Sequence, residues 1–124
     1  MILDANFLID LLTEEPGAVA KLEEIADAHL RVPTLAYTEV AIGIDPASET
    51  GERFEEIMED ITIIPYGREE ARRAVDIQRT LVNAGEQIGA IDAMIAGTAI
   101  ARDATVVTRN VREFRRTPVR VSPY

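Results

Sequence analysis

The chain has 124 residues, of which 47% are hydrophobic and 28% charged, a balance typical of a globular protein long enough to bury a core. It contains no cysteine, which excludes disulfides and thiolate metal sites. No segment approaches the roughly 20 consecutive apolar residues that span a bilayer, and no basic stretch precedes an apolar run at the start. We therefore expect a cytoplasmic protein with no membrane partner.

The formal net charge of −9 argues, taken alone, against a nucleic-acid partner, because phosphate binding normally needs a basic surface. The charge is unevenly distributed, however. Acids concentrate at 49–60, whereas residues 109–124 are basic through Arg109, Arg112, Arg115, Arg116 and Arg120. This asymmetry keeps nucleic acid open as a partner, although a compositional bias of the source explains it equally well.

In the first half of the chain, apolar residues occur in short runs or at helical spacing. In chain order they predict a strand at 1–4, helices at 6–12 and 18–29, a strand at 30–33, a helix at 34–43 and an acidic helix at 52–60. Thr34 is expected to cap its helix, because threonine side chains accept hydrogen bonds from backbone N–H groups there. His29, the only histidine, is expected to close helix 18–29 as a partner of its C-terminal dipole.

The second half continues the same alternation. It predicts a strand at 61–65, a helix at 68–83, a helix at 91–102, a strand at 105–108, a helical turn at 111–115 and a strand at 119–121. The apolar positions expected in helix 68–83 are Ala71, Ala74, Val75, Ile77 and Leu81. Short apolar strands alternating with helices predict an α/β fold, in which helices cover both faces of a parallel sheet. We expect residues 1–124 to form a single domain.

Three acids lie in apolar segments, where carboxylates are rarely found without compensation of their charge. Asp4 ends the first predicted strand, Glu39 lies in the helix after the second, and Asp92 opens another helix. Sites in open α/β sheets form at the carboxyl ends of strands, and residues 108–110 follow a further strand at that edge. We therefore expect these acids to converge on one site.

Acids that converge repel one another, and a divalent cation offsets this repulsion. Ligands that are only oxygen atoms suit Mg²⁺, with Mn²⁺ as a possible substitute, rather than zinc or copper. Such an ion activates water for phosphodiester hydrolysis and neutralises the developing charge.

Each acid also has a purely structural explanation. Asp4 can be the cap of the helix that follows it, Glu39 can lie on the solvent side of its helix, and Asp92 can be an ordinary acid at a helix start.

Four segments, in this order, resemble those of PIN-domain ribonucleases, and most of all the VapC toxins of toxin–antitoxin pairs. They are Asp4-Ala5-Asn6, Thr38-Glu39-Val40, Ile91-Asp92-Ala93-Met94-Ile95-Ala96, and Val107-Thr108-Arg109-Asn110-Val111-Arg112-Glu113-Phe114. The resemblance covers essentially the whole chain. It implies a PIN-like three-layer α/β/α fold and a Mg²⁺-dependent endoribonuclease that cleaves RNA. It also implies a homodimer and a cognate antitoxin protein that holds the enzyme inactive.

By position, the resemblance assigns Asp4 and Asp92 as the principal metal ligands and Glu39 as the second acid. It assigns Asn6 and Thr108 to polar positions in the same pocket.

The chain departs from the family pattern at two positions. Ala5 stands where relatives often have threonine, and Asn110 occupies a position that is aspartate in many PIN domains. We expect Glu113 to supply the fourth catalytic acid instead.

The arginines after the late strand are the candidate RNA contacts. We expect Arg109 and Arg112 to hold the RNA backbone, whereas Arg115 and Arg116 can equally face the antitoxin or solvent. Phe114, beside them, is expected to pack against the sheet.

Two other functions remain open. A receiver-like regulatory module also gathers acids around Mg²⁺ at strand ends, but it usually needs a lysine after a late strand, and Lys21 is the only lysine. A non-catalytic PIN scaffold is the second alternative, and only Asn110 supports it.

Overall fold

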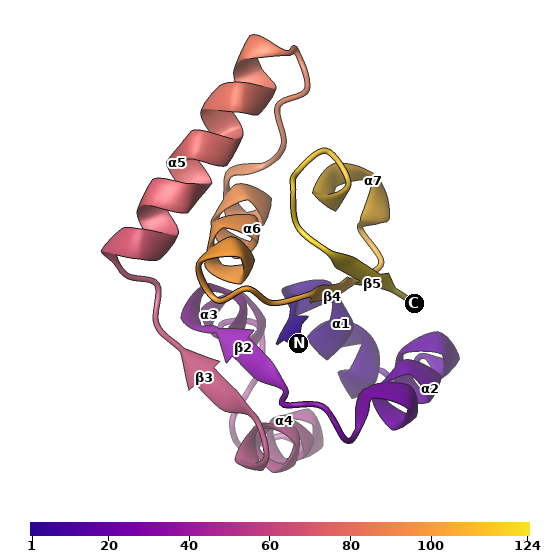
Figure 1. The fold of residues 1–124 in the computed structure, drawn as a ribbon. Helices are drawn as coiled ribbons and strands as arrows, with labels where there is room; N and C mark the ends of the chain where they lie inside the picture. The colour runs from indigo at the N-terminus through magenta and orange to yellow at the C-terminus, as the bar shows by residue number, and fades with distance from the viewer.

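A five-stranded parallel sheet forms the centre of the protein, which was analysed as a computed structural model describing residues 1–124 (Figure 1). The strands are β1 (Ile2–Leu3), β2 (Arg31–Pro33), β3 (Thr62–Ile64), β4 (Val106–Thr108) and β5 (Val121–Pro123). Their order across the sheet is β3-β2-β1-β4-β5, and every neighbouring pair is parallel. The prediction of an α/β fold with a central parallel sheet is confirmed.

Seven helices connect the strands. They are α1 (Ala5–Leu12), α2 (Pro16–Ile25), α3 (Thr34–Ala41), α4 (Glu49–Glu59), α5 (Arg68–Asn83), α6 (Ala90–Ala101) and α7 (Val111–Phe114). Crossovers between parallel strands are right-handed, so the direction of each connection across the sheet decides the face that its helices cover. The path from β1 through β2 to β3 runs one way, and the path from β3 to β4 and β5 runs back. Figure 1 accordingly shows α1, α2 and α4 on one side of the sheet and α5, α6 and α7 on the other, which gives three layers.

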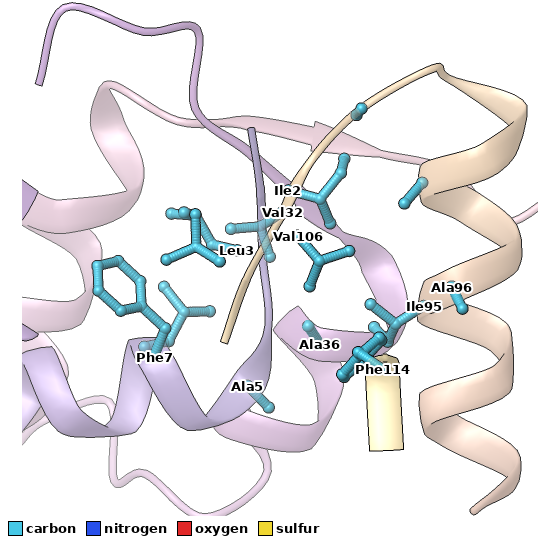
Figure 2. Close-up of a cluster of buried hydrophobic side chains, with 14 of the residues drawn as sticks. Ile2, Leu3, Ala5, Phe7, Val32, Ala36, Ile95, Ala96, Val106 and Phe114 are labelled. Atoms are coloured by element: carbon cyan, nitrogen blue, oxygen red, sulfur yellow. The ribbon is translucent and has the colours of Figure 1, made fainter. Parts of the chain in front are cut away.

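The core lies on both faces of the central strands. Ile2, Leu3 and Val106 are fully buried, because successive side chains of a strand point to opposite faces and both faces are covered. In Figure 2, Leu3 and Phe7 of α1 lie on one side of the central strands, and Ile95 of α6 lies on the other side. Each fully buried aliphatic side chain stabilises the fold by about 1.5–3 kcal/mol, so these short strands are held mainly by their packing. Phe114 is also fully buried, as predicted.

The helices α5 and α6 touch closely at Gly97. A methyl group added at Gly97 would lie 2.5 Å from the backbone nitrogen of Ala74 and 2.6 Å from the carbonyl oxygen of Glu70. Backbone atoms on a packed helix cannot move aside as a flexible side chain can. The close packing of α6, the helix that carries Asp92, against α5 therefore depends partly on the absence of a side chain at Gly97.

Several local expectations were wrong. The helix α2 ends at Ile25, so His29 lies beyond it in a loop, where its Nε2 stands 3.0 Å from the Thr62 hydroxyl instead of meeting the helix dipole. Thr34 is the first residue of α3, and the N-cap is Pro33, which makes no side-chain hydrogen bond. Val75 is 46% exposed because it lies on the outer face of α5.

None of the helices is both long and apolar enough to cross a membrane.

We predict that Gly97→Ala lowers the free energy of unfolding by about 1–3 kcal/mol, because the new methyl group overpacks the contact between α5 and α6. The matched control is Gly43→Ala, where the nearest atom to the added methyl group is 3.8 Å away. The control should change stability by less than about 1 kcal/mol. Urea unfolding measures the free energy of unfolding of both variants. If Gly97→Ala is as stable as Gly43→Ala, the close approach of the two helices does not contribute to stability.

Candidate active site

Asp4 stands where β1 ends and α1 begins. Strand β1 pairs with β4 in a register that places Leu3 opposite Val107, so the next residues, Asp4 and Thr108, meet side by side. The Thr108 hydroxyl donates a hydrogen bond to Asp4 Oδ2, and the Phe7 backbone N–H donates to Oδ1 at 2.9 Å. Asp4 is therefore the N-cap of α1, and its carboxylate is held at both oxygens while it is only 5% exposed.

The three acids singled out in the sequence line one cleft of about 290 Å³. Asp4 comes from the end of β1, Glu39 from α3 and Asp92 from the first turn of α6, and the Asn6 side chain of α1 lines the same cleft. Glu39 is exposed and Asp92 half-buried, so the cleft is open to solvent on the side of α3. The structural explanations thus hold in part: Asp4 does cap a helix and Glu39 does face solvent, yet both line the cleft.

The turn between β4 and α7 supports the acids from one side. The Asn110 side chain donates a hydrogen bond to Asp92 Oδ2 at 2.9 Å, and its backbone N–H donates to the Thr108 hydroxyl oxygen at 2.9 Å. Asn110 therefore orients Asp92 through its amide group. A neutral donor at this position holds an acid in place without adding another negative charge.

Burial and mutual repulsion disfavour the ionised acids. Burial raises the pKa of Asp4 to about 6, hydrogen bonds from Thr108 and Phe7 partly offset this, and the charge of Asp92 raises it again. Burial also raises the pKa of Asp92, and the negative charges of Glu113 and Glu39 add to the rise. The charge of Glu113 thus acts on Asp92, although Glu113 itself does not line the cleft.

A divalent cation fits this site by charge and by donor type. Carboxylate and amide oxygens are the donors that Mg²⁺ and Mn²⁺ prefer, and a positive charge would relieve the repulsion that raises both pKa values. No three acidic or histidine side chains, however, stand in a geometry that could already hold a metal ion. Asp4, Asp92 and Glu39 are the acids that line the cleft, and their side chains do not form a finished cage.

The two arginines predicted to hold RNA lie in different surroundings. The Arg109 guanidinium forms an ion pair with Asp10, with Nη1 3.3 Å from Oδ2. Arg112 is exposed on α7 and makes no hydrogen bond or ion pair. Arg116, by contrast, donates to the carbonyl oxygens of Glu86 and Gln87 at 3.4 and 3.2 Å, so it secures the loop before α6.

Asp10 and Tyr124 were missed by the sequence analysis. Asp10 is only 6% exposed and its Oδ2 accepts a hydrogen bond from the Tyr124 hydroxyl at 2.7 Å. The Tyr124 ring packs edge-on against Phe7, with ring centroids 5.0 Å apart. The signal that could have found Asp10 is its place inside the apolar run 7–12, where it is the only charged residue. Nothing in the sequence singles out Tyr124.

We predict that Asp4→Asn stabilises the metal-free protein at high pH. A pKa of about 6 in place of 3.8 means that ionised Asp4 costs the fold up to about 3 kcal/mol above pH 7. Because the folded state binds the proton more tightly, this group adds stability as the pH falls from about 6 to about 4. The advantage of Asp4→Asn over the wild type should therefore be larger at pH 8 than at pH 4.5.

Urea unfolding in EDTA at the two pH values measures this difference. Glu55→Gln, which neutralises an exposed acid on α4, is the control and should show no such dependence. An advantage that is the same at both pH values would mean that Asp4 is ionised without cost.

The chain was compared with known proteins. The family model described as "PIN domain" matches residues 1–119. A curated relative, the tRNA(fMet)-specific endonuclease VapC of Shigella flexneri, is 28% identical over 119 residues, which are 93% of this chain and 89% of the relative.

Two solved structures show the same fold. VapBC2 from Rickettsia felis, bound to a DNA fragment from the promoter, superposes with a TM-score of 0.87 at 22% identity, over 99% of this chain and 97% of that one. A toxin–antitoxin complex from Klebsiella pneumoniae superposes with a TM-score of 0.83 at 25% identity, over 99% and 97%. The three-layer α/β/α arrangement is therefore shared along the full length of the chain.

Proposed function

The chain belongs to the PIN-domain family, and on that basis we propose that it is a metal-dependent endoribonuclease, acting in the cytoplasm as the toxin of a toxin–antitoxin pair. The observation that carries the proposal is the convergence of Asp4, Glu39 and Asp92 on one cleft. These residues come from three separate elements, and burial together with mutual repulsion makes their charges costly without a cation. The ribonuclease activity named for a relative supports RNA as the substrate.

In this proposal Asp4, Asp92 and Glu39 hold Mg²⁺ or Mn²⁺. The bound ion would supply positive charge to the phosphate and lower the pKa of water, as phosphodiester hydrolysis requires. The protein's own part is to fix the acids in place. Thr108 and the Phe7 N–H orient Asp4.

Residues at the start of α7 fix Asp92 in place. Asn110 orients its carboxylate, and Glu113 adds a fourth negative charge beside it. These four acids repel an RNA phosphate at the cleft, and a bound cation would reduce this repulsion, so metal binding should strengthen RNA binding.

The same proposal includes two protein partners. A cognate antitoxin protein would keep the enzyme inactive, which the likeness to a toxin–antitoxin complex supports. A homodimer is expected from the family resemblance, and the mass of the purified protein in solution tests it.

The alternative functions have less support. The strand order β3-β2-β1-β4-β5 differs from the 2-1-3-4-5 order of receiver-like folds, and Lys21 lies on α2, where it pairs with Glu24. Asn110, the only support for a non-catalytic scaffold, donates a hydrogen bond to Asp92 and so helps to build the acidic cleft.

We predict that the wild-type protein cleaves single-stranded RNA in Mg²⁺ or Mn²⁺ and not in EDTA. Asp4→Asn and Asp92→Asn should each lower kcat by at least about 100-fold, because each removes a carboxylate from the cation. Gel analysis of cleavage products measures the rate, and Glu55→Gln should cleave like the wild type. Cleavage by Asp4→Asn at the wild-type rate would falsify the role of this carboxylate.

Thr108 offers a finer test, since its hydroxyl supports Asp4 without lining the cleft. Thr108→Val keeps the shape of the side chain and removes the donor, so metal affinity or activity should fall about 10- to 100-fold. Thr108→Ser keeps the hydroxyl and should recover most of the loss. Calorimetric titration with Mn²⁺ separates affinity from rate, and a valine variant with unchanged affinity and activity would count against this support.

A further inference from the structure

Three consecutive residues, the last of β4 and the two that follow it, contact three different acids. Thr108 donates to Asp4, Arg109 pairs with Asp10 and Asn110 donates to Asp92. The first and third of these contacts hold acids that line the cleft. The contact between them holds an acid outside it, and that contact is not explained by the chemistry proposed above.

Asp10 is poorly explained as a stabilising residue. It is buried on α1, and both its partners, Tyr124 and Arg109, reach the same oxygen, Oδ2. Taking a carboxylate out of water is costly, and replacing a buried ion pair by well-packed apolar residues of similar volume is often neutral or stabilising. The role of Asp10 is therefore better explained by the residue that it holds in place, Arg109.

One nitrogen of the Arg109 guanidinium contacts Asp10, and much of the side chain faces solvent. Its side chain remains 55% exposed although Nη1 lies 3.3 Å from Asp10. A guanidinium group carries five N–H donors in a rigid fork, so a contact through one nitrogen leaves the others available for a second anion. Arg109 directly follows Thr108, which contacts Asp4, so the backbone of Arg109 lies beside the acidic cleft.

We propose that Asp10, itself held by Tyr124, is a positioning residue that orients Arg109 to bind an RNA backbone phosphate beside the cleft. The inference rests on the proposed function, because it needs RNA as the substrate. An arginine that is already oriented loses less conformational freedom when it binds, which matters in a protein of net charge −9 that repels polyanions. Tyr124 fixes the carboxylate through its hydroxyl and through the packing of its ring on Phe7.

A change in RNA affinity after Asp10 is neutralised has opposite directions for a positioning residue and for a residue that only repels RNA. Asp10→Asn removes a negative charge and keeps the shape of the side chain and an oxygen that can accept from Tyr124. If Asp10 acts only as a nearby charge, this variant binds RNA more tightly than the wild type. If Asp10 positions Arg109, the variant binds RNA more weakly although the protein has become less negative.

The experiment measures binding of a fluorescent single-stranded RNA by anisotropy in EDTA, where the proposed hydrolysis stops, over a series of KCl concentrations. Arg109→Gln should bind about tenfold more weakly, and the slope of log affinity against log salt should fall by about one. Asp10→Asn should bind at least about threefold more weakly, and the double variant no more weakly than Arg109→Gln alone. The control Glu55→Gln removes an equal charge from exposed α4 and should not weaken binding.

Cleavage in Mg²⁺ supplies a second readout. Arg109→Gln and Asp10→Asn should raise KM for RNA and change kcat less than threefold, since neither residue lines the cleft. Should Asp10→Asn fail to fold, Tyr124→Phe tests the same arrangement without a change of charge, and it should also raise KM.

The outcomes separate this inference from the proposed function. Suppose that the wild type cleaves RNA. The positioning role is then overturned if the variants keep the wild-type KM and salt slope, or if Asp10→Asn binds RNA more tightly, while the proposed nuclease activity stands. A wild type that neither binds nor cleaves RNA overturns both.

Discussion

Both oxygens of Asp4 are occupied by the chain itself, and the rest of the site depends on this arrangement. The parallel pairing of β1 with β4 brings Thr108 to one oxygen, and the start of α1 brings the Phe7 N–H to the other. Burial raises the pKa of this carboxyl to about 6, and the negative charges of Asp92 and Asp10 add to the rise, although the two hydrogen bonds oppose it. The sheet thus builds a concentration of negative charge that only a cation relieves well.

Much of the fold could be predicted because its elements follow from local patterns. The helix expected at 68–83 coincides with α5, and short apolar strands between helices indicated a parallel sheet. Strand order could not be predicted, since it depends on which strands pair, and pairing is a property of the whole chain. The end of α2 was placed too late because Ala26 and Ala28 are exposed, so the helix has no apolar face to bury beyond Ile25.

The site was predictable only in part. Asp4, Glu39 and Asp92 could be found because each is an acid in an apolar segment, and the structure brings them to one cleft. The support from Asn110 could not be inferred, because a hydrogen bond to Asp92 requires the relative placement of α6 and α7. Asp10 and Tyr124 meet only when the last strand returns to α1, a contact that no local pattern records. Contacts of this kind determine how the acids and arginines are held, whereas local sequence indicates which acids are present.

The most direct test of this account is anomalous diffraction from crystals grown in Mn²⁺. The account predicts a manganese peak in the cleft, bonded to carboxylate oxygens of Asp4 and Asp92, with Glu39 drawn toward the ion. It also predicts that Thr108 keeps its hydrogen bond to Asp4 when the ion is bound. A well-ordered cleft with no manganese, at a concentration of the ion that supports RNA cleavage, would contradict the claim that these acids are a metal centre.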